Sequence, residues 1–295
     1  MHICRKLNSV NLLMAAATVL SLGSAVRADA PLMVVETQGG NARMLVSMPA
    51  YKVLASPKWS HDKKQLTFDA WNQPADTHVC IATADGREPK DVAPGAMPDW
   101  SPDDKQLAFH TFIPRQGIAV MNTDGAGRQW LCAGFGPRWS PDGSLIACVS
   151  YHEKGPGIYV FDTIEAKQRK VLDGKFRLIS HGLDWSPDGT QLCFTGMESP
   201  GKRFLATVEV AEQPRPAKIL LRGDVGWRAS WSPDGKKLAF AFKPPGQQHE
   251  SVHLLEVGQA GTPVIVSGQP EDRENRDPSW SADGTQIVFS SSTTP

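Results

Sequence analysis

The sequence lacks an excess of charge of either sign, and it lacks long apolar runs after its first thirty residues. Its 295 residues carry 31 lysines and arginines against 31 aspartates and glutamates. This balance excludes the basic footprint of a nucleic-acid-binding protein and the acidic composition of a disordered tail. No later apolar stretch approaches the ~18 residues of a membrane-spanning helix, and none has helical periodicity.

The common motifs of catalysis and metal binding are also absent. There is no Gly-x-Ser-x-Gly nucleophile elbow, no phosphate-binding glycine loop and no Gly-x-Gly-x-x-Gly fingerprint, which argues against serine hydrolases and nucleotide-dependent enzymes. His249 and His253 are four residues apart at a loop-to-strand junction, where they would not share a helical face, so zinc is not expected. We expect no catalytic residue, no metal and no other cofactor.

Cysteine is scarce, and no two cysteines form a Cys-x-x-Cys pair. After the N-terminal leader the sequence has four: Cys80, Cys132, Cys148 and Cys193. Cys148 and Cys193 occupy positions on expected strands, where small free cysteines commonly pack in a core. We therefore expect buried free thiols, although an oxidising compartment would permit disulfides.

The N-terminus has the pattern of a signal peptide. Arg5 and Lys6 precede the uncharged apolar run Leu12–Val26, and small residues follow, with cleavage expected after Ala28. We predict a signal peptide over residues 1–28 and a periplasmic or secreted chain, with an uncleaved anchor helix as the alternative. The remaining chain would carry 28 basic against 31 acidic side chains. We therefore expect a monomer that binds no nucleic acid and does not insert into a membrane after cleavage.

What the sequence has in abundance is a repeat. Gly (26) and Pro (23) are frequent, and six segments centre on a Trp-Ser pair that most often continues as Pro-Asp-Gly. The six tryptophans are 39 to 49 residues apart: Trp59, Trp100, Trp139, Trp185, Trp231 and Trp280. Repeats of this length that contain several short strands predict the blades of a β-propeller.

Each part of the motif has a mechanical explanation. Ser-Pro-Asp-Gly suits a type I turn whose last residue needs a positive φ, and the tryptophan before it would wedge between neighbouring blades. Apolar residues seven and nine positions after each tryptophan, such as Leu66 and Phe68, predict a strand after every turn. Lys63 and Asp104 replace the glycine in the first two repeats, and Lys63 should cost about 1 kcal/mol there.

The ends of the sequence predict how the ring closes. With strands a to d counted outward from the axis, the chain stops just after strand b of the sixth repeat. The strand patterns of Leu32–Glu36 and Ala42–Val46 have no tryptophan motif before them, and they supply the missing strands c and d. We predict an all-β, six-bladed propeller with four strands per blade, as one domain over residues 29–295. Pairing of the two chain ends would seal it and hide sheet edges.

The Trp-Ser-Pro-Asp-Gly signature resembles that of the TolB-like six-bladed propellers of the bacterial periplasm and the wider group of WD-like repeat proteins. The resemblance covers residues 32–291, and the separate N-terminal domain of TolB has no counterpart in the sequence. It implies a propeller that docks partner proteins at one face.

One face of the expected propeller carries short, uniform turns, and the other carries the longer and more varied b–c and d–a loops. Variable loops on a rigid scaffold are where binding commonly takes place. The partner-binding residues predicted on the loop-bearing face are Phe135, Tyr151, His152, His181, Trp227, Arg228, Arg276 and Asp277. Some have structural alternatives: His181 as a loop histidine bonded to backbone, Trp227 as a cover of the channel, and Arg276 with Asp277 as a solvated pair.

Two classes of function remain after these exclusions. The first is a non-enzymatic exported propeller that binds a protein or peptide through its loop-bearing face. The second is a propeller enzyme, a polysaccharide lyase or glycosidase, which would need carboxylates such as Glu153, Glu198 or Asp277 to converge at the channel mouth. A sensor of a small ligand is a third possibility.

Overall fold

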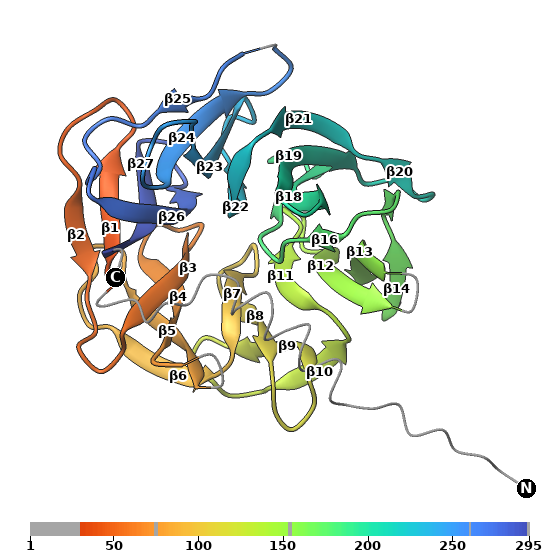
Figure 1. The fold of residues 1–295 in the computed structure, drawn as a ribbon. Coiled ribbons are helices and arrows are strands. Elements are labelled where there is room, and N and C mark those ends of the chain that lie inside the picture. The colour runs from red at the N-terminus through yellow and green to blue at the C-terminus, as the bar shows by residue number, and fades with distance from the viewer. Residues whose placement is uncertain (1–29, 74–75, 153–154, 260, 294–295) are drawn as a thin grey trace, which may run out of the picture.

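The computed structural model describes residues 30–73, 76–152, 155–259 and 261–293, and all regular elements in these ranges are β-strands (Figure 1). The predicted signal peptide, residues 1–28, lies outside the described residues. Within the described ranges, no helix has the length and apolar character needed to cross a membrane.

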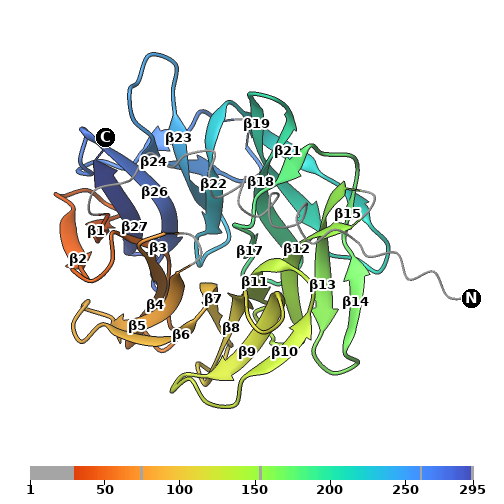
Figure 2. The same cartoon turned by 60° about the horizontal axis from the view of Figure 1, so that its bottom comes forward.

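The strands form six antiparallel sheets arranged as blades around a central axis, as predicted (Figures 1 and 2). From the axis outward, blade one contains β3 (Val53–Trp59), β4 (Gln65–Trp71), β5 (Thr77–Thr83) and β6 (Lys90–Pro94). Blade two contains β7 (Ala96–Trp100), β8 (Gln106–Thr111), β9 (Gly117–Asn122) and β10 (Gln129–Cys132). Blade three contains β11 (Phe135–Trp139), β12 (Leu145–His152), β13 (Gly155–Asp162) and β14 (Lys167–Lys170). Blade five contains β22 (Asp224–Trp231), β23 (Lys237–Lys243), β24 (Ser251–Glu256) and β25 (Val264–Ile265).

Blade four departs from the regular pattern. Its inner strand is divided into β16 (Leu178–Ile179) and β17 (Asp184–Trp185), which both pair with β18 (Gln191–Ser199); β19 (Lys202–Glu209) and β21 (Lys218–Arg222) follow outward. A short parallel pairing of β15 (Leu172–Asp173) with β20 (Arg215–Pro216) joins blades three and four. Neither feature is apparent from the repeat.

Blade six is built from both ends of the chain. It contains β26 (Arg273–Trp280), β27 (Gln286–Thr293), β1 (Leu32–Glu36) and β2 (Arg43–Val46). β1 pairs with β27 without interruption from Leu32 opposite Ser290 to Glu36 opposite Gln286. The predicted closure is therefore confirmed, and it pairs strand edges that would otherwise be open.

The turns behave as the motif predicts. In blade three the Ser140 hydroxyl donates to Asp142 at 2.6 Å, and the Gly143 amide donates to the Ser140 carbonyl at 2.9 Å. Gly143 has a φ of 75°, and the two replacements Lys63 and Asp104 are held in the same left-handed region at 64° and 57°. The hydrogen bonds of the turn thus impose its geometry even where glycine is absent.

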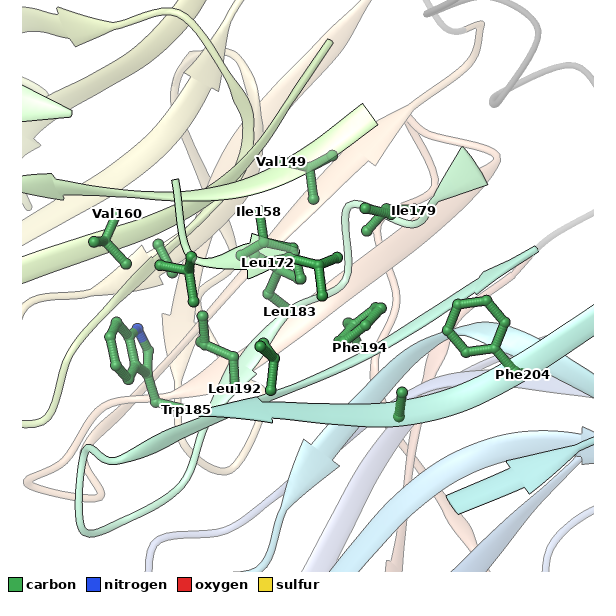
Figure 3. Close-up of a cluster of buried hydrophobic side chains, with 14 residues drawn as sticks. Val149, Ile158, Val160, Leu172, Ile179, Leu183, Trp185, Leu192, Phe194 and Phe204 are labelled. Carbon is green, nitrogen blue, oxygen red and sulfur yellow. The ribbon is translucent and has the colours of Figure 1, made fainter. Parts of the chain in front are cut away.

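The hydrophobic core lies between the blades. Each pair of neighbouring blades shares a cluster of buried apolar side chains. Figure 3 shows the cluster between blades three and four, where Trp185 and Phe194 meet Val160 and Ile158. The Trp185 indole also donates to the Arg138 carbonyl of blade three at 3.0 Å. The tryptophan therefore acts as the predicted wedge, and its removal would open a cavity costing about 3–5 kcal/mol.

The topology assigns the loops to two faces. The Ser-Pro-Asp-Gly turns and the c–d turns lie at one end of the strands, and the b–c and d–a loops lie at the other end, here called the loop-bearing face. Ala30 is hydrogen-bonded at the start of β3, where its amide donates to the Lys52 carbonyl at 2.8 Å. Thr293 ends β27 opposite Arg273, which begins β26. Both ends of the described propeller therefore lie on the loop-bearing face.

Candidate binding face at the channel mouth

The inner strands enter the ring from the loop-bearing face and surround the axis (Figures 1 and 2). The residue three positions before each motif tryptophan lies near this entrance, and the six are called here the collar: Ser56, Met97, Gly136, Gly182, Arg228 and Asp277. Ser56, Met97 and Asp277 have positive φ angles of 53° to 56° at breaks in the strand register. A left-handed conformation costs such residues about 1 kcal/mol or more, so part of the strained backbone lies at the channel mouth and part in turns of the opposite face, such as those of Lys63 and Asp104.

Two glycines of the collar allow neighbouring blades to approach closely. A Cβ atom at Gly136 would overlap the His181 carbonyl of blade four. A Cβ atom at Gly182 would overlap the Arg228 side chain of blade five, to which Gly182 is joined by a parallel bridge. At the collar, the backbone of blade four therefore lies in close contact with blade three on one side and with blade five on the other.

Aromatic rings cover the mouth over blades two to four. The ring of Phe135 is stacked between His110 and His181, with centroid distances of 4.5 and 4.7 Å. Tyr151 stands edge-on to Phe135 and His181, and its hydroxyl donates to the Ile179 carbonyl at 3.0 Å. Burial lowers the pKa of His110 to about 4 and that of His181 to about 3. Both imidazoles are therefore neutral at pH 7, and the four rings form an uncharged aromatic sector.

A buried polar cluster occupies the opposite side of the mouth. The Arg228 guanidinium donates to the Ser56 hydroxyl at 2.7 Å and lies 3.6 Å from the Asp277 carboxylate. Ser56 donates in turn to Asp69 Oδ2 at 2.9 Å, and the Met97 amide donates to the same oxygen at 2.8 Å. Asp69 Oδ1 is buried without a hydrogen-bond partner among the described residues, and burial raises the pKa of Asp69 to about 6.

An ion pair crosses the channel below the collar. The Lys58 ammonium of blade one lies 2.6 Å from Asp184 Oδ1 of blade four, on the opposite side of the ring. The second Asp184 oxygen accepts the Trp231 amide of blade five at 2.9 Å. The axis is therefore bridged by side chains at this level.

A network of charged side chains, here called the charged rim, lies over blades four to six and contains Arg203, Glu250, Glu274 and Arg276. The Arg203 guanidinium lies 4.2 Å from the centre of a ring of Trp227 and 3.8 Å from Glu250. Glu250 also pairs with Arg276, which contacts Glu274 at 3.1 Å. Burial raises the pKa of Glu250. An open pocket of about 740 Å³, lined by the b–c and d–a loops of blade five, adjoins this network.

Comparison with known families agrees with this architecture. A family model described as the TolB beta propeller domain matches residues 114–294, more than half of the chain. The chain belongs to this family.

Individual relatives of this TolB-family propeller are distant or match over short stretches. A Tol-Pal system protein TolB of Alcanivorax borkumensis is 45% identical over 60 residues, which span 20% of this chain and 13% of that protein. The structure assigned to TolB from Agrobacterium tumefaciens has a TM-score of 0.70 at 19% identity, covering 92% of this chain and 100% of its own. TolB of Acinetobacter baumannii has a TM-score of 0.63 at 16% identity, covering 95% and 68%. At these identities the two structures support the fold alone.

The TolB-family fold brings several of the predicted residues together, although their role in binding stays a prediction. Phe135, Tyr151 and His181 meet in the aromatic sector. His152 lies at the end of β12, its backbone paired with Gly155, and its side chain is outside the described part of the chain.

The surroundings of the other four predicted residues differ from what the sequence suggests. Arg228 and Asp277 form an ion pair within the mouth, with side chains only 11% and 18% exposed. Asp277 therefore pairs with Arg228 rather than with Arg276, whose carboxylate partners are on Glu250 and Glu274. Trp227 has a packing partner in the Arg203 guanidinium.

Sequence reasoning missed the residues that support these side chains. Asp69 and His110 both stand ten positions after a motif tryptophan, on the second strand, where blades three and five have Val149 and Ala241. Blades four and six also have a polar residue there, Thr195 and Ser290, so only the ionisable character of Asp69 and His110 distinguishes them within the repeat. Lys58 and Asp184 directly precede motif tryptophans, but nothing in the repeat indicates that they pair across the axis.

Proposed function

We propose that this TolB-family propeller is an exported, non-enzymatic binding protein that docks a protein or peptide on its loop-bearing face, over the channel mouth. The observation that carries the proposal is the pairing of an uncharged aromatic sector with a charged rim around one mouth. Interfaces that bind proteins commonly combine aromatic anchors with a polar surround.

The aromatic sector would supply the apolar part of the contact. Phe135 and Tyr151 are only half-buried, and the nearby loop between β8 and β9 exposes 66% of Ile113. Stacking and hydrogen bonds already hold the rings in place, so a partner would not have to order them on binding. Such rigid, partly exposed rings are suitable anchors.

The charged rim would orient the partner. Trp227 and Arg276 are half-buried and held by Arg203 and Glu250, so each presents a fixed edge to solvent. Arg228 and Asp277 lie deeper and would contact a side chain that enters the mouth. The Lys58–Asp184 bridge below favours docking at the mouth over passage through the channel.

The channel carboxylates support a binding role better than catalysis. Asp184 holds Lys58 and a backbone amide, and Asp277 pairs with Arg228. Asp69 accepts a hydroxyl and a backbone amide on one oxygen. These contacts give the carboxylates structural partners, which supports binding over the alternative of a polysaccharide lyase or glycosidase.

Export is the second part of the proposal. It is supported by Arg5 and Lys6, by the apolar run Leu12–Val26 and by the small residues up to Ala28. Expression of the full chain in a bacterium, followed by N-terminal sequencing of the periplasmic fraction, is expected to show a first residue of Asp29. Retention of residues 1–28 on a cytoplasmic protein would contradict export, and their retention on a membrane-bound protein would contradict cleavage.

The docking face can be tested with a matched pair of substitutions. Purified residues 29–295 are used to capture proteins from a periplasmic extract, and the affinity of each captured protein is then measured in solution. Ile113→Asp places a charge beside the aromatic sector, whereas Ile164→Asp places it on the opposite face, in a turn where Ile164 is 86% exposed. We expect Ile113→Asp to weaken binding at least ~10-fold and Ile164→Asp to leave it unchanged. Equal effects, or an effect of Ile164→Asp alone, would reject the loop-bearing face.

A further inference from the structure

Two of the four buried cysteines lie against each other between blades two and three. Cys132 ends β10, the outer strand of blade two, and Cys148 lies in β12 of blade three. They are 6% and 0% exposed and belong to the same apolar cluster. The Gln168 side-chain amide donates to both sulfur atoms, at 3.8 Å to Cys132 Sγ and 3.3 Å to Cys148 Sγ, so one side-chain nitrogen joins the two thiols.

The backbone, rather than flexible side chains, brings the two thiols together. Gly134 follows Cys132 by two residues, and a Cβ atom there would lie only 2.7 Å from Cys148 Sγ. The next residue, Phe135, pairs with Val149 in the sheet of blade three. The chain that leaves Cys132 is thus held directly beside the strand that carries Cys148.

The other two thiols do not share this arrangement. Cys80 is packed between blades six and one, and Cys193 is packed between blades four and five. Both are fully buried free thiols in interfaces separate from that of Cys132 and Cys148. They therefore serve as internal controls for any reaction at the pair.

We propose that Cys132 and Cys148 form a disulfide when the chain folds in the presence of a small-molecule disulfide oxidant, linking the outer strand of blade two to the second strand of blade three. The Cys132 thiolate attacks one sulfur of the oxidant and releases the first small thiol. The Cys148 thiolate then attacks the mixed disulfide at Cys132 and releases the second. Two protein thiols are oxidised, two protons leave them, and one oxidant disulfide is reduced to two thiols.

Burial determines when the reaction takes place. Neither sulfur is open to an oxidant in the folded protein, because Cys148 is fully buried and Cys132 nearly so. Its hydrogen bond to Cys132 and its burial also raise the pKa of the Cys148 thiol, which keeps it in the unreactive protonated form. The disulfide is therefore expected to form during folding, and to form slowly or not at all in protein that has already folded reduced.

Refolding with a defined oxidant tests the proposal. Residues 29–295, unfolded and reduced in guanidinium chloride, are refolded with oxidised and reduced glutathione. The product is acidified, unfolded again and alkylated without reduction, so that the reagent reaches every buried free thiol, and it is then mapped by mass spectrometry. We expect the peptides of Cys132 and Cys148 to be joined, lighter by two hydrogens, in most molecules, and Cys80 and Cys193 to be alkylated. Reduction is expected to lower the melting temperature by about 5 °C, because the bond closes a short loop of the unfolded chain.

Two variants provide controls. In Cys132→Ser and Cys148→Ala the melting temperature should not respond to reductant. Alkylation of all four thiols in the wild type, a stable glutathione adduct on Cys132 alone, or a bond to Cys80 or Cys193 would each overturn the proposal. Peptide mapping of the wild-type protein distinguishes these outcomes even if a variant does not fold.

Discussion

Replacing Asp184 with alanine would measure how much of the stability of the ring depends on the ion pair across its axis. Asp184 is 8% exposed, and its two oxygens hold the Lys58 ammonium at 2.6 Å and the Trp231 amide at 2.9 Å. The substitution leaves a largely buried ammonium and a buried N–H group without their partners. Removing one member of a buried pair costs about 3–5 kcal/mol, and the unpaired amide adds about 1 kcal/mol. Because the Lys58 side chain keeps 20% of its exposure, we expect a total loss of about 3–4 kcal/mol.

Urea unfolding followed by tryptophan fluorescence would give this free energy, and two further variants divide it. Asp184→Asn keeps an oxygen for the Trp231 amide, so it should cost about 1 kcal/mol less than alanine. Lys58→Met should cost far less in the Asp184→Ala background than in the wild type, with a coupling of at least ~2 kcal/mol. A loss below about 1 kcal/mol for Asp184→Ala, or no coupling with Lys58, would refute the importance assigned to this pair.

Three further predictions concern pH, turns and ring closure. Burial raises the pKa of Asp69 from 3.8 to about 6, so between these pH values the folded state keeps a proton that the unfolded state releases. The free energy of unfolding should therefore fall as pH rises from about 4 to 6. In urea titrations, Asp69→Asn should remove this fall and raise the free energy of unfolding by about 2–3 kcal/mol at pH 7. Lys63→Gly should raise the melting temperature, because glycine adopts the left-handed φ of 64° without strain. Asp104→Gly should lower the melting temperature, because Asp104 accepts the His61 and Asp62 amides at 2.9 and 2.8 Å. An equal response of both variants would show that strain does not govern these turns. Deletion of residues 29–48 removes β1 and β2 and exposes the edge of β27, so the product should aggregate. A product that is monomeric in size-exclusion chromatography and unfolds cooperatively would argue against the closure.

The fold was predictable because its determinants are local in sequence. Each Ser-Pro-Asp-Gly turn specifies a left-handed position, and alternating residues such as Leu66 and Phe68 specify the strand that follows. Once six turns are counted, the number of strands leaves the ring one way to close. The divided inner strand of blade four was not predictable, because the interruption at residues 180–183 coincides with a close approach of Gly182 to Arg228 of blade five, which is a contact between blades.

The partners within the candidate site could not be predicted, because they depend on contacts between distant blades. Lys58 and Asp184 are separated by 126 residues, and Arg228 and Ser56 by 172. A repeat specifies where each position lies in its own blade, but it does not specify which charges face each other across the axis. For the same reason the sequence did not predict that the Arg203 guanidinium packs over the Trp227 ring.

The positions of Ala30 and Thr293 have a practical consequence for any binding measurement. Because both lie on the loop-bearing face, a tag, resin or sensor surface attached at either terminus would stand in front of the rings and charges at which we propose that a partner docks. Attachment through the opposite face, for example at a cysteine replacing Lys105, whose side chain is 81% exposed, would turn the loops toward solution. Comparing a terminally tethered sample with one tethered through the opposite face would therefore separate the effect of orientation on the support from that of affinity.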